Sequence, residues 1–505
     1  MKRRDRKRVW KRKKKIAARL DRDNLDFGGK PVFQGTNIDY EMSGRITATA
    51  HGGVGAIHTM LNRLDFSKEI NEALSLLKIH NPYFESDHIL NLAYNVLTGG
   101  TRLEDIEALR QDAGYMDAIG AARIPDPTTG GDFLRRFTAP VIEILMDTIN
   151  KIRQKVWEEC AKEDPSFYNK AVIEVDGTLT ETLGECKHGM DISYKGVWGY
   201  APLIVTLANT REVLFIVNRP GNTPSSKDAA EWINRGIALV MGRFRRIVVR
   251  GDTDFSLTDH MDQWDKDKVR FVFGYDAVPK LVAQAQGLPE ADWEPFLRKE
   301  KYTVKTRRRA RPVNVKEEIV RRREFENQRL LCEDIQEFAY SPTKCDKTYR
   351  MIVVRKNISV EKGEHVMFEE YRYFFYITND WTTRAIDIVF EANQRCDQEN
   401  IIAQLKSGIN ALRMPVDNLE SNWAYMVIAS LSWNFKAWYG LLIPEETESR
   451  EVVRMEYKKF LTNFIQIPTQ IVRTGRRIVH RILAYNSYLP IFFQTFARIR
   501  RTKFG

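Results

Sequence analysis

The stretch Ala171-Val172-Ile173-Glu174-Val175-Asp176-Gly177 is a short apolar run that ends in an acid and a glycine. A run of this length is typical of a strand buried within a sheet. Residues 246–250 lead into Gly251-Asp252 in the same way, so two strands are each expected to end on an aspartate. An unpaired buried charge is strongly disfavoured, and ligand sites of open α/β sheets lie at strand ends. Asp176 and Asp252 together therefore indicate a metal site, with two turn or capping aspartates as the equally reasonable alternative.

Other strands and helices are expected around these two runs. Strand character recurs at residues 202–207, 213–217, 269–273, 349–354 and 371–378. Helical spacing marks residues 53–160, 225–241, 382–409, 419–442 and 450–485. Ser225 or Ser226 is expected to cap the helix 225–241. This order predicts an α/β fold with a mixed sheet flanked by helices.

Length and composition exclude several classes of protein. With 505 residues, roughly two to four domains are expected. Hydrophobic residues make up 43% and charged residues 29% of the chain, which argues against wholesale disorder. The five cysteines form no C-x-x-C pair, which argues against a disulfide scaffold or a zinc knuckle. The N-terminus lacks the apolar core of a secretory signal, and the apolar stretch 425–444 is interrupted by polar residues. We expect a soluble cytoplasmic protein that makes no membrane contact.

The positive charge is concentrated at the two ends of the chain. Residues 1–20 contain twelve Lys and Arg against one acid, and residues 471–505 contain eight, including Arg476 and Arg477, against none. The intervening residues 21–470 carry a net charge of −7. A third basic cluster, 298–329, holds thirteen Lys and Arg against five Glu and includes Arg307, Arg308 and Arg309. Three separated clusters favour a nucleic-acid partner, with solvated tails or an anionic membrane anchor as the alternatives.

Two further sets of charged residues lie in helical stretches. Arg395, Glu399 and Lys406 are spaced by four and seven residues, so they share one face of a helix. That face is either part of an active site or an exposed stripe of ion pairs. Arg135 and Arg136 end a short helix that follows the turn at 125–128. This helix is either a DNA-recognition helix or half of an ordinary helical hairpin.

In this order the motifs resemble those of DDE transposases of bacterial insertion sequences, which have an RNase H-like core. The matching segments are VIEVDGT around Asp176, YKGVWGYAPL at 194–203, RPGNTPSSKDA at 219–229, VVRGDTDF around Asp252, NQRCDQENIIAQLKSG around Glu399 and SNWAYMVIASLSWN at 421–434, with weaker similarity at 102–110 and 128–137. In that family the third acid lies in a Tyr-x2-Arg-x3-Glu-x6-Lys motif. Arg395, Glu399 and Lys406 fit these spacings, and Ala392 occupies the tyrosine position. Asp254 stands where family members often have glycine, which makes it a rival of Asp252 as a metal ligand.

The resemblance implies a DNA transposase that binds terminal inverted repeats, cleaves DNA and joins it to a target. Two Mg²⁺ (or Mn²⁺) ions about 3.5–4 Å apart would be bound by Asp176, Asp252 and Glu399. Arg395 and Lys406 would hold phosphates near the cleaved bond. The expected partners are transposon ends and target DNA, bound by a homo-oligomer, as a dimer, without a nucleotide cofactor. The location implied is the bacterial cytoplasm, in association with the nucleoid.

The residues expected to contact DNA outside the active site all come from basic segments. They are Arg135, Arg136, Arg307, Arg308, Arg309, Arg476 and Arg477. Two other functions remain open: an RNase H-like nuclease that hydrolyses DNA without strand transfer, and a catalytically silent DNA-binding derivative. Trp293 is expected to lie in the core, with stacking on a flipped base as the alternative.

The expected organisation places an RNase H-like core after a helical DNA-binding domain and divides it by an insertion. The expected segments are a basic arm and linker (1–50), an N-terminal helical domain (51–165), the first part of the core (166–280), a β-containing insertion (281–370), the second part of the core with the Glu399 helix (371–450) and a basic helical C-terminal region (451–505). The 146 residues between Asp252 and Glu399 leave room for that insertion.

Overall fold

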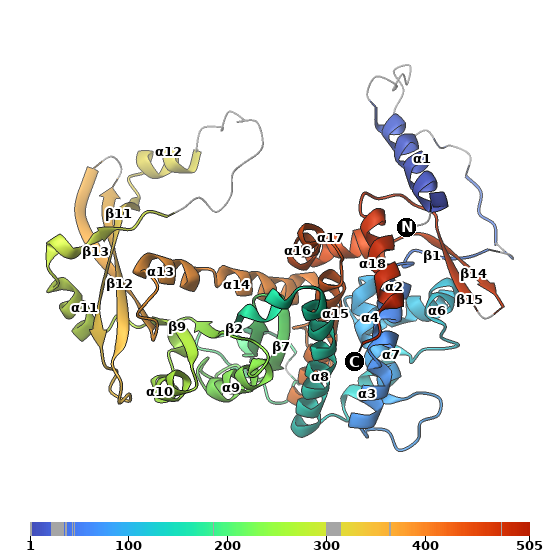
Figure 1. Ribbon diagram of the computed structural model, residues 1–505, viewed down its shortest axis with the longest axis horizontal. Coiled ribbons are helices and arrows are strands. Elements are labelled where there is room, and N and C mark those ends of the chain that lie inside the picture. The colour runs from blue at the N-terminus through green and yellow to red at the C-terminus, as the bar shows by residue number, and fades with distance from the viewer. Residues whose placement is uncertain are drawn as a thin grey trace. The chain divides into compact units, whose positions relative to one another are not determined.

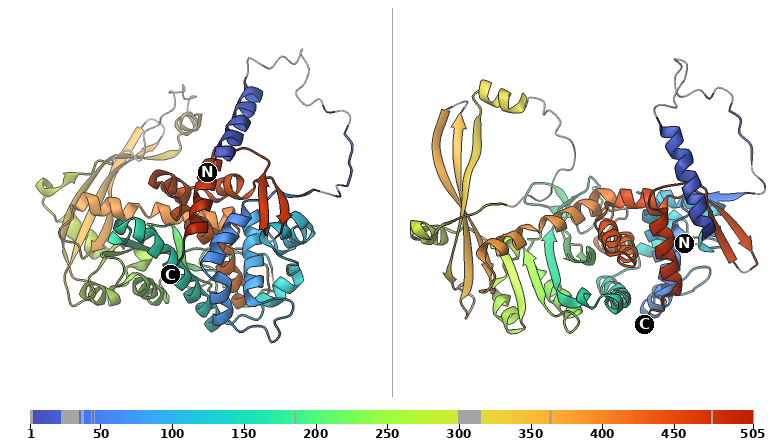
Figure 2. Two further views of the ribbon diagram at one scale, coloured as in Figure 1. Left: turned by 45° about the vertical axis from the view of Figure 1, so that its right-hand side comes forward. Right: turned by 45° about the horizontal axis from the view of Figure 1, so that its top comes forward.

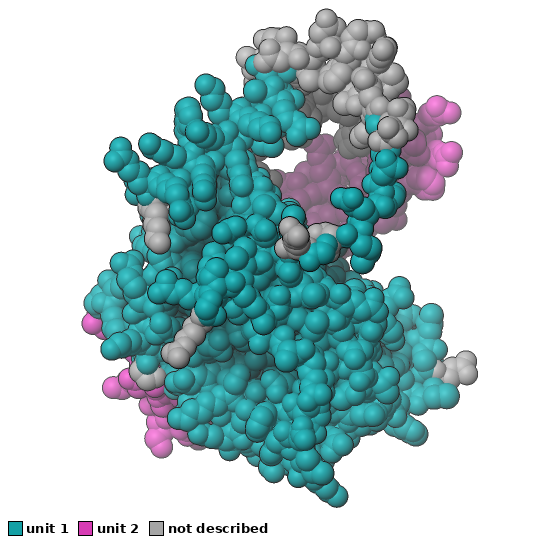
Figure 3. All heavy atoms as spheres, turned by 90° about the vertical axis from the view of Figure 1, so that its right-hand side faces the viewer, with its two compact units in different colours: residues 1–169, 177–223, 398–505 teal, residues 170–176, 224–397 magenta. Residues whose placement is uncertain are grey.

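The computed structural model describes residues 3–21, 35, 38–42, 44, 46–184, 186–298, 315–362, 365–475 and 477–504 (Figure 1). The chain forms two compact units, each assembled from separate segments of the sequence (Figure 3). The first unit comprises residues 1–169, 177–223 and 398–505, and the second comprises residues 170–176 and 224–397. In the part of the chain that the structure describes, no helix has the length and apolar character needed to cross a membrane.

The second unit is built on a mixed sheet, which confirms the predicted α/β class. In spatial order, the strands that this unit contributes to the nine-stranded sheet are β10 (Glu294–Pro295), β11 (Glu326–Tyr340), β12 (Tyr349–Lys362), β13 (His365–Thr378), β9 (Val269–Tyr275), β8 (Ile247–Gly251) and β2 (Ala171–Gly177). Strands β2, β8 and β9 run parallel, and β9 to β13 and all pairs beyond it are antiparallel. Every strand predicted between 246 and 378 is present. Strand β11 had no sequence signal because residues 326–332 are exposed and therefore carry no apolar period.

The second unit also contains helices. They are α9 (Ala229–Val240), α10 (Thr258–Lys266), α11 (Pro279–Gln286), α12 (Val315–Arg322) and α13 (Ala385–Asn393). Helix α13 packs through Ile388 and Val389 on Val272 of β9 and on Ile352 and Val354 of β12.

The predicted serine cap of the first of these helices is wrong. Helix α9 begins at Ala229 with Asp228 as its N-cap residue. Residues 225–228 form turns instead, in which Lys227 N donates to Pro224 O and Ala229 N donates to Ser226 O. The serines therefore precede the helix by a full turn.

The first unit is mainly helical. It contains α2 (Val54–Arg63), α3 (Phe66–Ala73), α4 (Glu85–Thr98), α5 (Ile106–Gln111), α6 (Ala113–Ile119), α7 (Pro127–Leu134), α8 (Ala139–Glu163) and α15 (Leu419–Leu441), with the hairpin β6 (Leu203–Leu207) and β7 (Glu212–Val217) and a small sheet of β3 (Thr180–Glu181), β5 (Trp198–Tyr200) and β4 (Asp191–Ile192). The helical pattern predicted for 53–160 is confirmed. Trp423, Trp433 and Trp438 of α15 are each at most 5% exposed, so their predicted core role is also confirmed.

A fully buried ion pair lies in the core of this unit. Glu212 and Arg153 are both fully buried, with 2.9 Å between Arg153 Nε and Glu212 Oε1. Trp157 and Trp438 donate their indole N–H groups to the same carboxylate at 2.8 and 2.6 Å. These donors satisfy a charge that would otherwise be very costly in the core.

The predicted helical C-terminal region is wrong in part. After α16 (Glu446–Arg454), α17 (Tyr457–Phe460) and the π-helical turn η7 (Leu461–Ile465), the chain forms a hairpin of β14 (Thr469–Thr474) and β15 (Arg477–Ile482) before α18 (Leu489–Arg501). Strand β1 (Thr47–Thr49) pairs with β14 and completes a sheet. Gly475 has a φ of 54°, which permits the tight turn, and β-branched residues make up at least half of each strand.

Residues 382–409, predicted as one helix, form three segments. Helix α13 ends at Asn393, α14 (Cys396–Ala403) begins after a two-residue break, and a π-helical turn η6 (Gln404–Gly408) follows. Arg395 lies in the break and Lys406 in the π-helical turn. The expectation that Arg395, Glu399 and Lys406 share the face of one regular helix is therefore wrong.

Candidate active site

The two predicted aspartates lie at the ends of neighbouring parallel strands. In the register of β2 and β8, Glu174 stands beside Arg250, so Asp176 and Asp252, two residues further on, come to the same level. Parallel neighbours lie about 4.8 Å apart, which brings the two backbone positions close together. Both side chains are partly exposed. Their predicted strand-end positions are thus confirmed.

A buried ion pair lies directly before these aspartates. Arg250 Nε is 2.7 Å from Glu174 Oε1, and the two side chains are 4% and 0% exposed. Residues two apart on a strand point to the same face, so this pair shares a face of the sheet with Asp176 and Asp252. Sequence reasoning missed this pair. The sequence shows one ionisable residue, Glu174 or Arg250, within each of two apolar runs. That these two residues pair with each other is evident only from the strand register.

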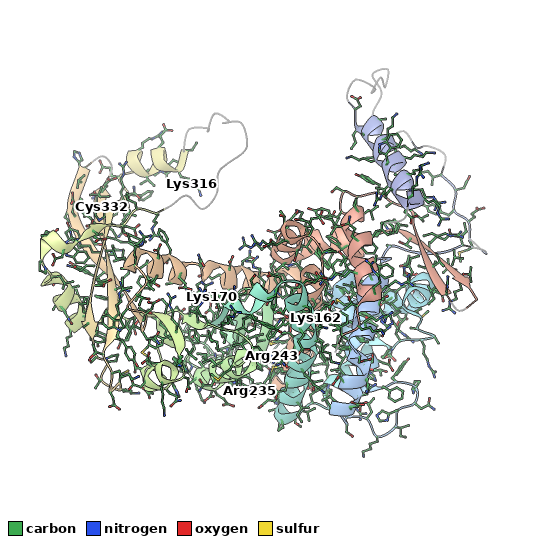
Figure 4. The ribbon with its side chains drawn as sticks, in the orientation of Figure 1. Lys162, Lys170, Arg235, Arg243, Lys316 and Cys332 are labelled. Carbon is green, nitrogen blue, oxygen red and sulfur yellow. The ribbon has the colours of Figure 1, made fainter. Side chains whose placement is uncertain are left out.

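The ion pair also contacts the C-terminal end of α13. Arg250 Nη1 donates to the backbone oxygen of Glu391 at 2.8 Å and lies 3.4 Å from Gln394 Oε1. The Glu391 carboxylate binds Lys170 Nζ at 2.5 Å and Arg270 Nη2 at 2.6 Å; Lys170 is labelled in Figure 4. The residues that follow α13 are therefore held against the face of the sheet that carries Asp176 and Asp252, which we call the aspartate face.

Arg395 reaches one of the two aspartates. Its Nη1 is 2.8 Å from Asp252 Oδ2, and both side chains remain accessible, at 25% and 33%. The other oxygen of Asp252 accepts the N–H of Asp254 at 3.1 Å and caps a short 3-10 helix. Asp254 itself is exposed. Of the two rivals, Asp252 is the one that the structure brings to Arg395.

Glu399 and Lys406 belong to the first unit. Glu399 is exposed on α14. Lys406 Nζ donates to Leu179 O at 2.9 Å and lines a cavity of about 780 Å³. Arg102 and Arg413 contribute further positive charge to the cavity, opposed by Glu104 and Glu181.

Arg135 and Arg136 are both engaged within the first unit. Asp126 caps α7 by accepting Thr129 N at 2.8 Å. Arg135 Nε is 3.0 Å from Asp417 Oδ1, and Arg136 Nη1 donates to Leu76 O at 3.3 Å. Both arginines are still exposed, so a phosphate could reach them.

The remaining predicted contacts divide into described and undescribed residues. Arg307, Arg308, Arg309 and Arg476 lie outside the described residues. Arg477 is exposed at the start of β15. Trp293 is only half-buried, with the Arg355 guanidinium 4.3 Å from its ring centroid, so the predicted core position is wrong.

The donor chemistry suits a hard divalent cation. Asp176 and Asp252 offer carboxylate oxygens at one edge of the sheet, and Asp252 already binds a cationic group. Among the described residues, no three His, Cys, Asp or Glu side chains form a ready metal cluster. Mg²⁺ commonly binds one or two carboxylates and completes its coordination with water and substrate phosphates, so it needs no such cluster.

Comparisons with known proteins identify a family. The family model described as transposase DDE domain group 1 matches residues 30–504, nearly the whole chain. No curated protein matches the chain. Among solved structures, the cryo-EM structure of a piggyBac transposase synaptic complex with hairpin DNA is 11% identical, with a TM-score of 0.34 over 83% of this chain and 84% of that chain. The family match confirms the resemblance drawn from the motifs.

Proposed function

The chain belongs to the family of transposases with a DDE domain of group 1, and from that premise we propose that it cleaves and joins DNA at the ends of a mobile element. The observation that carries this proposal is the alignment of Asp176 and Asp252 at the ends of two parallel strands, with Arg395 bound to Asp252. On this proposal the sheet around β2, β8 and β9 is an RNase H-like core, and its insertion, residues 281–370, contains β11, β12 and the first part of β13.

Asp176, Asp252 and Glu399 are the proposed ligands of two Mg²⁺ or Mn²⁺ ions. Such a pair of ions activates the attacking oxygen and stabilises the leaving oxygen in a displacement at phosphorus. The strand register holds Asp176 and Asp252 at one level on one face of the sheet, where both carboxylates are partly exposed. Glu399 is exposed four residues beyond Arg395 and supplies the third carboxylate.

Arg395 and Lys406 are the proposed phosphate-binding residues near the cleaved bond. Arg395 offers a planar set of N–H donors that fits a phosphate, and its contact with Asp252 keeps those donors beside the carboxylates. Lys406 is exposed and lines the 780 Å³ cavity next to residues 179–183, which follow shortly after Asp176. Arg135, Arg136, Arg307, Arg308, Arg309, Arg476 and Arg477 are the proposed contacts with DNA further away, within a homodimer.

The test is divalent-metal-dependent cleavage and joining of a labelled duplex that carries the sequences flanking the gene. Wild type is expected to nick the end and join the new 3′-OH to a second duplex. Asp252→Asn and Glu399→Gln should bind the duplex without cutting it. Asp254→Asn is the matched control, because it removes a neighbouring exposed carboxylate, and it should leave cleavage intact.

Other outcomes would change either the proposed function or the proposed residues. Cleavage without joining would indicate a nuclease, and binding without cleavage by wild type would indicate a silent DNA-binding derivative. Undiminished cutting by Glu399→Gln would remove that residue from the active site. Loss of cutting in Asp254→Asn but not in Asp252→Asn would reassign the metal ligand.

A further inference from the structure

The N-terminal basic segment forms a single helix with almost all of its charge exposed. Helix α1 (Arg3–Leu20) contains eleven Lys and Arg in eighteen residues, with Asp5 as its only acid. Ten of the eleven cations are exposed; the exception is Arg12, which is half-buried with Asp5 and Val9. These three residues are spaced by four and three positions and therefore share one face. One face of α1 is turned toward the protein, and the others present cations to solvent.

The face that carries Arg12 contacts the C-terminal hairpin. Arg12 Nη1 donates to the backbone oxygens of Ile482 and Ala484, at 2.7 and 3.1 Å. Both acceptors lie at or just beyond the end of β15, and Figures 1 and 2 show the helix beside this part of the first unit. One guanidinium therefore connects the basic segments from the two ends of the chain.

The hairpin adds its own cations to this surface. On β15, His480 points toward the body of the first unit, where its ring nitrogens lie 3.1 and 3.2 Å from the backbone oxygens of Gly52 and Ala118. Side chains alternate along a strand, so Arg477, Val479 and Arg481 face the opposite way. Both arginines are exposed. The ten exposed cations of α1 are thus joined by two on the adjacent strand.

A helix with this charge pattern needs an anionic partner. Six pairs of cations stand four residues apart in α1, and like charges at this spacing destabilise a helix. Cations near the N-terminus also oppose the helix dipole. A regular array of phosphates would remove both penalties, because each cation it neutralises no longer repels its neighbours. We propose that α1 and β15 form one continuous binding surface for the phosphate backbone of duplex DNA.

Duplex DNA fits this surface better than an anionic membrane does. A membrane-surface helix gathers its apolar residues on a face opposite its cations. In α1, Val9 lies on the face turned toward the protein, whereas Trp10 is 61% exposed among cations. The helix of eighteen residues is about 27 Å long, and duplex DNA offers about one phosphate charge per 1.7 Å of axis.

This surface deepens the proposed function, because the duplex that it holds is the substrate of the proposed reaction. The test measures the affinity of the full chain for a labelled 40-base-pair duplex of mixed sequence over a series of salt concentrations. Lys13→Gln and Arg12→Gln are a matched pair, since each removes one charge from adjacent positions and only Arg12 contacts the hairpin. Lys13→Gln should reduce the salt slope by about 0.9 at most, the value for one phosphate contact. Arg12→Gln should reduce it at least twice as much, because the remaining cations of α1 lose their alignment with Arg477 and Arg481.

Hydrogen exchange provides the second readout. Added duplex should protect the amides of α1 and of residues 477–484 together in wild type, and in Arg12→Gln it should protect the hairpin alone. Equal salt slopes and equal protection in the two variants would overturn the proposal. So would protection of α1 by phosphatidylserine vesicles but not by the duplex. If the slopes and protection are as expected but wild type neither cuts nor joins DNA, the surface stands and the catalytic proposal falls.

Discussion

The buried pair Glu174–Arg250 allows a quantitative test of how the aspartate face is built. Glu174→Gln keeps the volume of the side chain and removes its charge, which leaves Arg250 buried without a counter-charge. Removing one partner of a buried ion pair costs about 3–5 kcal/mol. Gln retains an oxygen that can accept from Arg250 Nε, now 2.7 Å from Glu174 Oε1, so we expect the lower end, about 3 kcal/mol.

The assay is native-state hydrogen exchange, because a chain with two compact units need not unfold in one step. A loss of about 3 kcal/mol corresponds to roughly a hundredfold faster exchange of amides that open with β2 and β8. Asp387→Asn is the control, since it breaks the exposed pair with Arg384, whose side chains are 75% and 38% exposed. An exposed pair contributes about 0–1 kcal/mol, so the control should leave β2 and β8 unchanged.

A double replacement separates the stability of the sheet from the anchoring of α13. Glu174→Leu combined with Arg250→Met replaces a buried ion pair by apolar groups, a change that is often neutral or stabilising. Exchange in β2 and β8 should then return to the wild-type rate. Exchange near 391–395 should be faster than in wild type, because the bond from Arg250 to Glu391 O is lost. The reasoning is refuted if Glu174→Gln accelerates exchange in β2 and β8 less than tenfold, or if the double variant restores both regions.

Three further outcomes are expected in the first unit. Glu212→Gln leaves the fully buried Arg153 unpaired and should lower stability by about 3–5 kcal/mol, measured by urea unfolding; a loss below about 1 kcal/mol would contradict this. Burial lowers the pKa of His88 to about 4, so the unfolded chain alone binds this proton between about pH 6.5 and 4. Stability should therefore fall as the pH drops through that window, and His88→Phe, which preserves the stacking on Phe133, should show a shallower loss; parallel pH profiles would refute the assignment. In thermal unfolding, Gly475→Val should lower stability by about 1–2 kcal/mol through its φ of 54° alone, since among the described residues no atom beyond the chain neighbours lies within 4 Å of an added Cβ; Gly475→Asn should lower stability less.

Much of the candidate site was predictable because it depends on local pattern. An apolar run that ends in an acid is visible in one dimension, so the strand-end positions of Asp176 and Asp252 were expected and are confirmed. The partnership of Glu174 with Arg250 was not visible, because it depends on which strands are neighbours and in which register. The spacing of Glu399 from Arg395 and Lys406 drew attention to it, but only the family resemblance gave it the role of a third metal ligand.

The regions that were predicted wrongly share a physical cause. The hairpin of β14 and β15 contains basic residues that are compatible with helix or strand, and its turn depends on the conformational freedom of Gly475. Strand β11 is exposed along residues 326–332, so burial imposes no period there. In each case tertiary pairing, rather than the local run of side chains, determines the structure.

The break between α13 and α14 shows how the sheet directs Arg395. In an uninterrupted α-helix the N–H of Arg395 would donate to the backbone oxygen of Glu391, four residues earlier. That oxygen instead accepts Arg250 Nη1 at 2.8 Å and the N–H of Gln394 at 3.2 Å, and the N–H of Arg395 donates to Ala392 O at 3.3 Å. The helix tightens and stops at this point, and the side chain of Arg395 reaches Asp252.

Arg250 therefore has two effects on the aspartate face. It pairs with the buried charge of Glu174, two residues before Asp176. It also donates to Glu391 O close to the end of α13, where Arg395 binds Asp252. A hydrophobic pair at 174 and 250 would provide the first effect at least as well, because it would avoid the desolvation of two charges. Only a side chain with several N–H donors can pair with Glu174 and also donate to a backbone oxygen of the neighbouring helix. The position of this costly buried ion pair is thus explained by the contact of Arg250 with α13 beside Arg395, and not by a gain in the stability of the sheet.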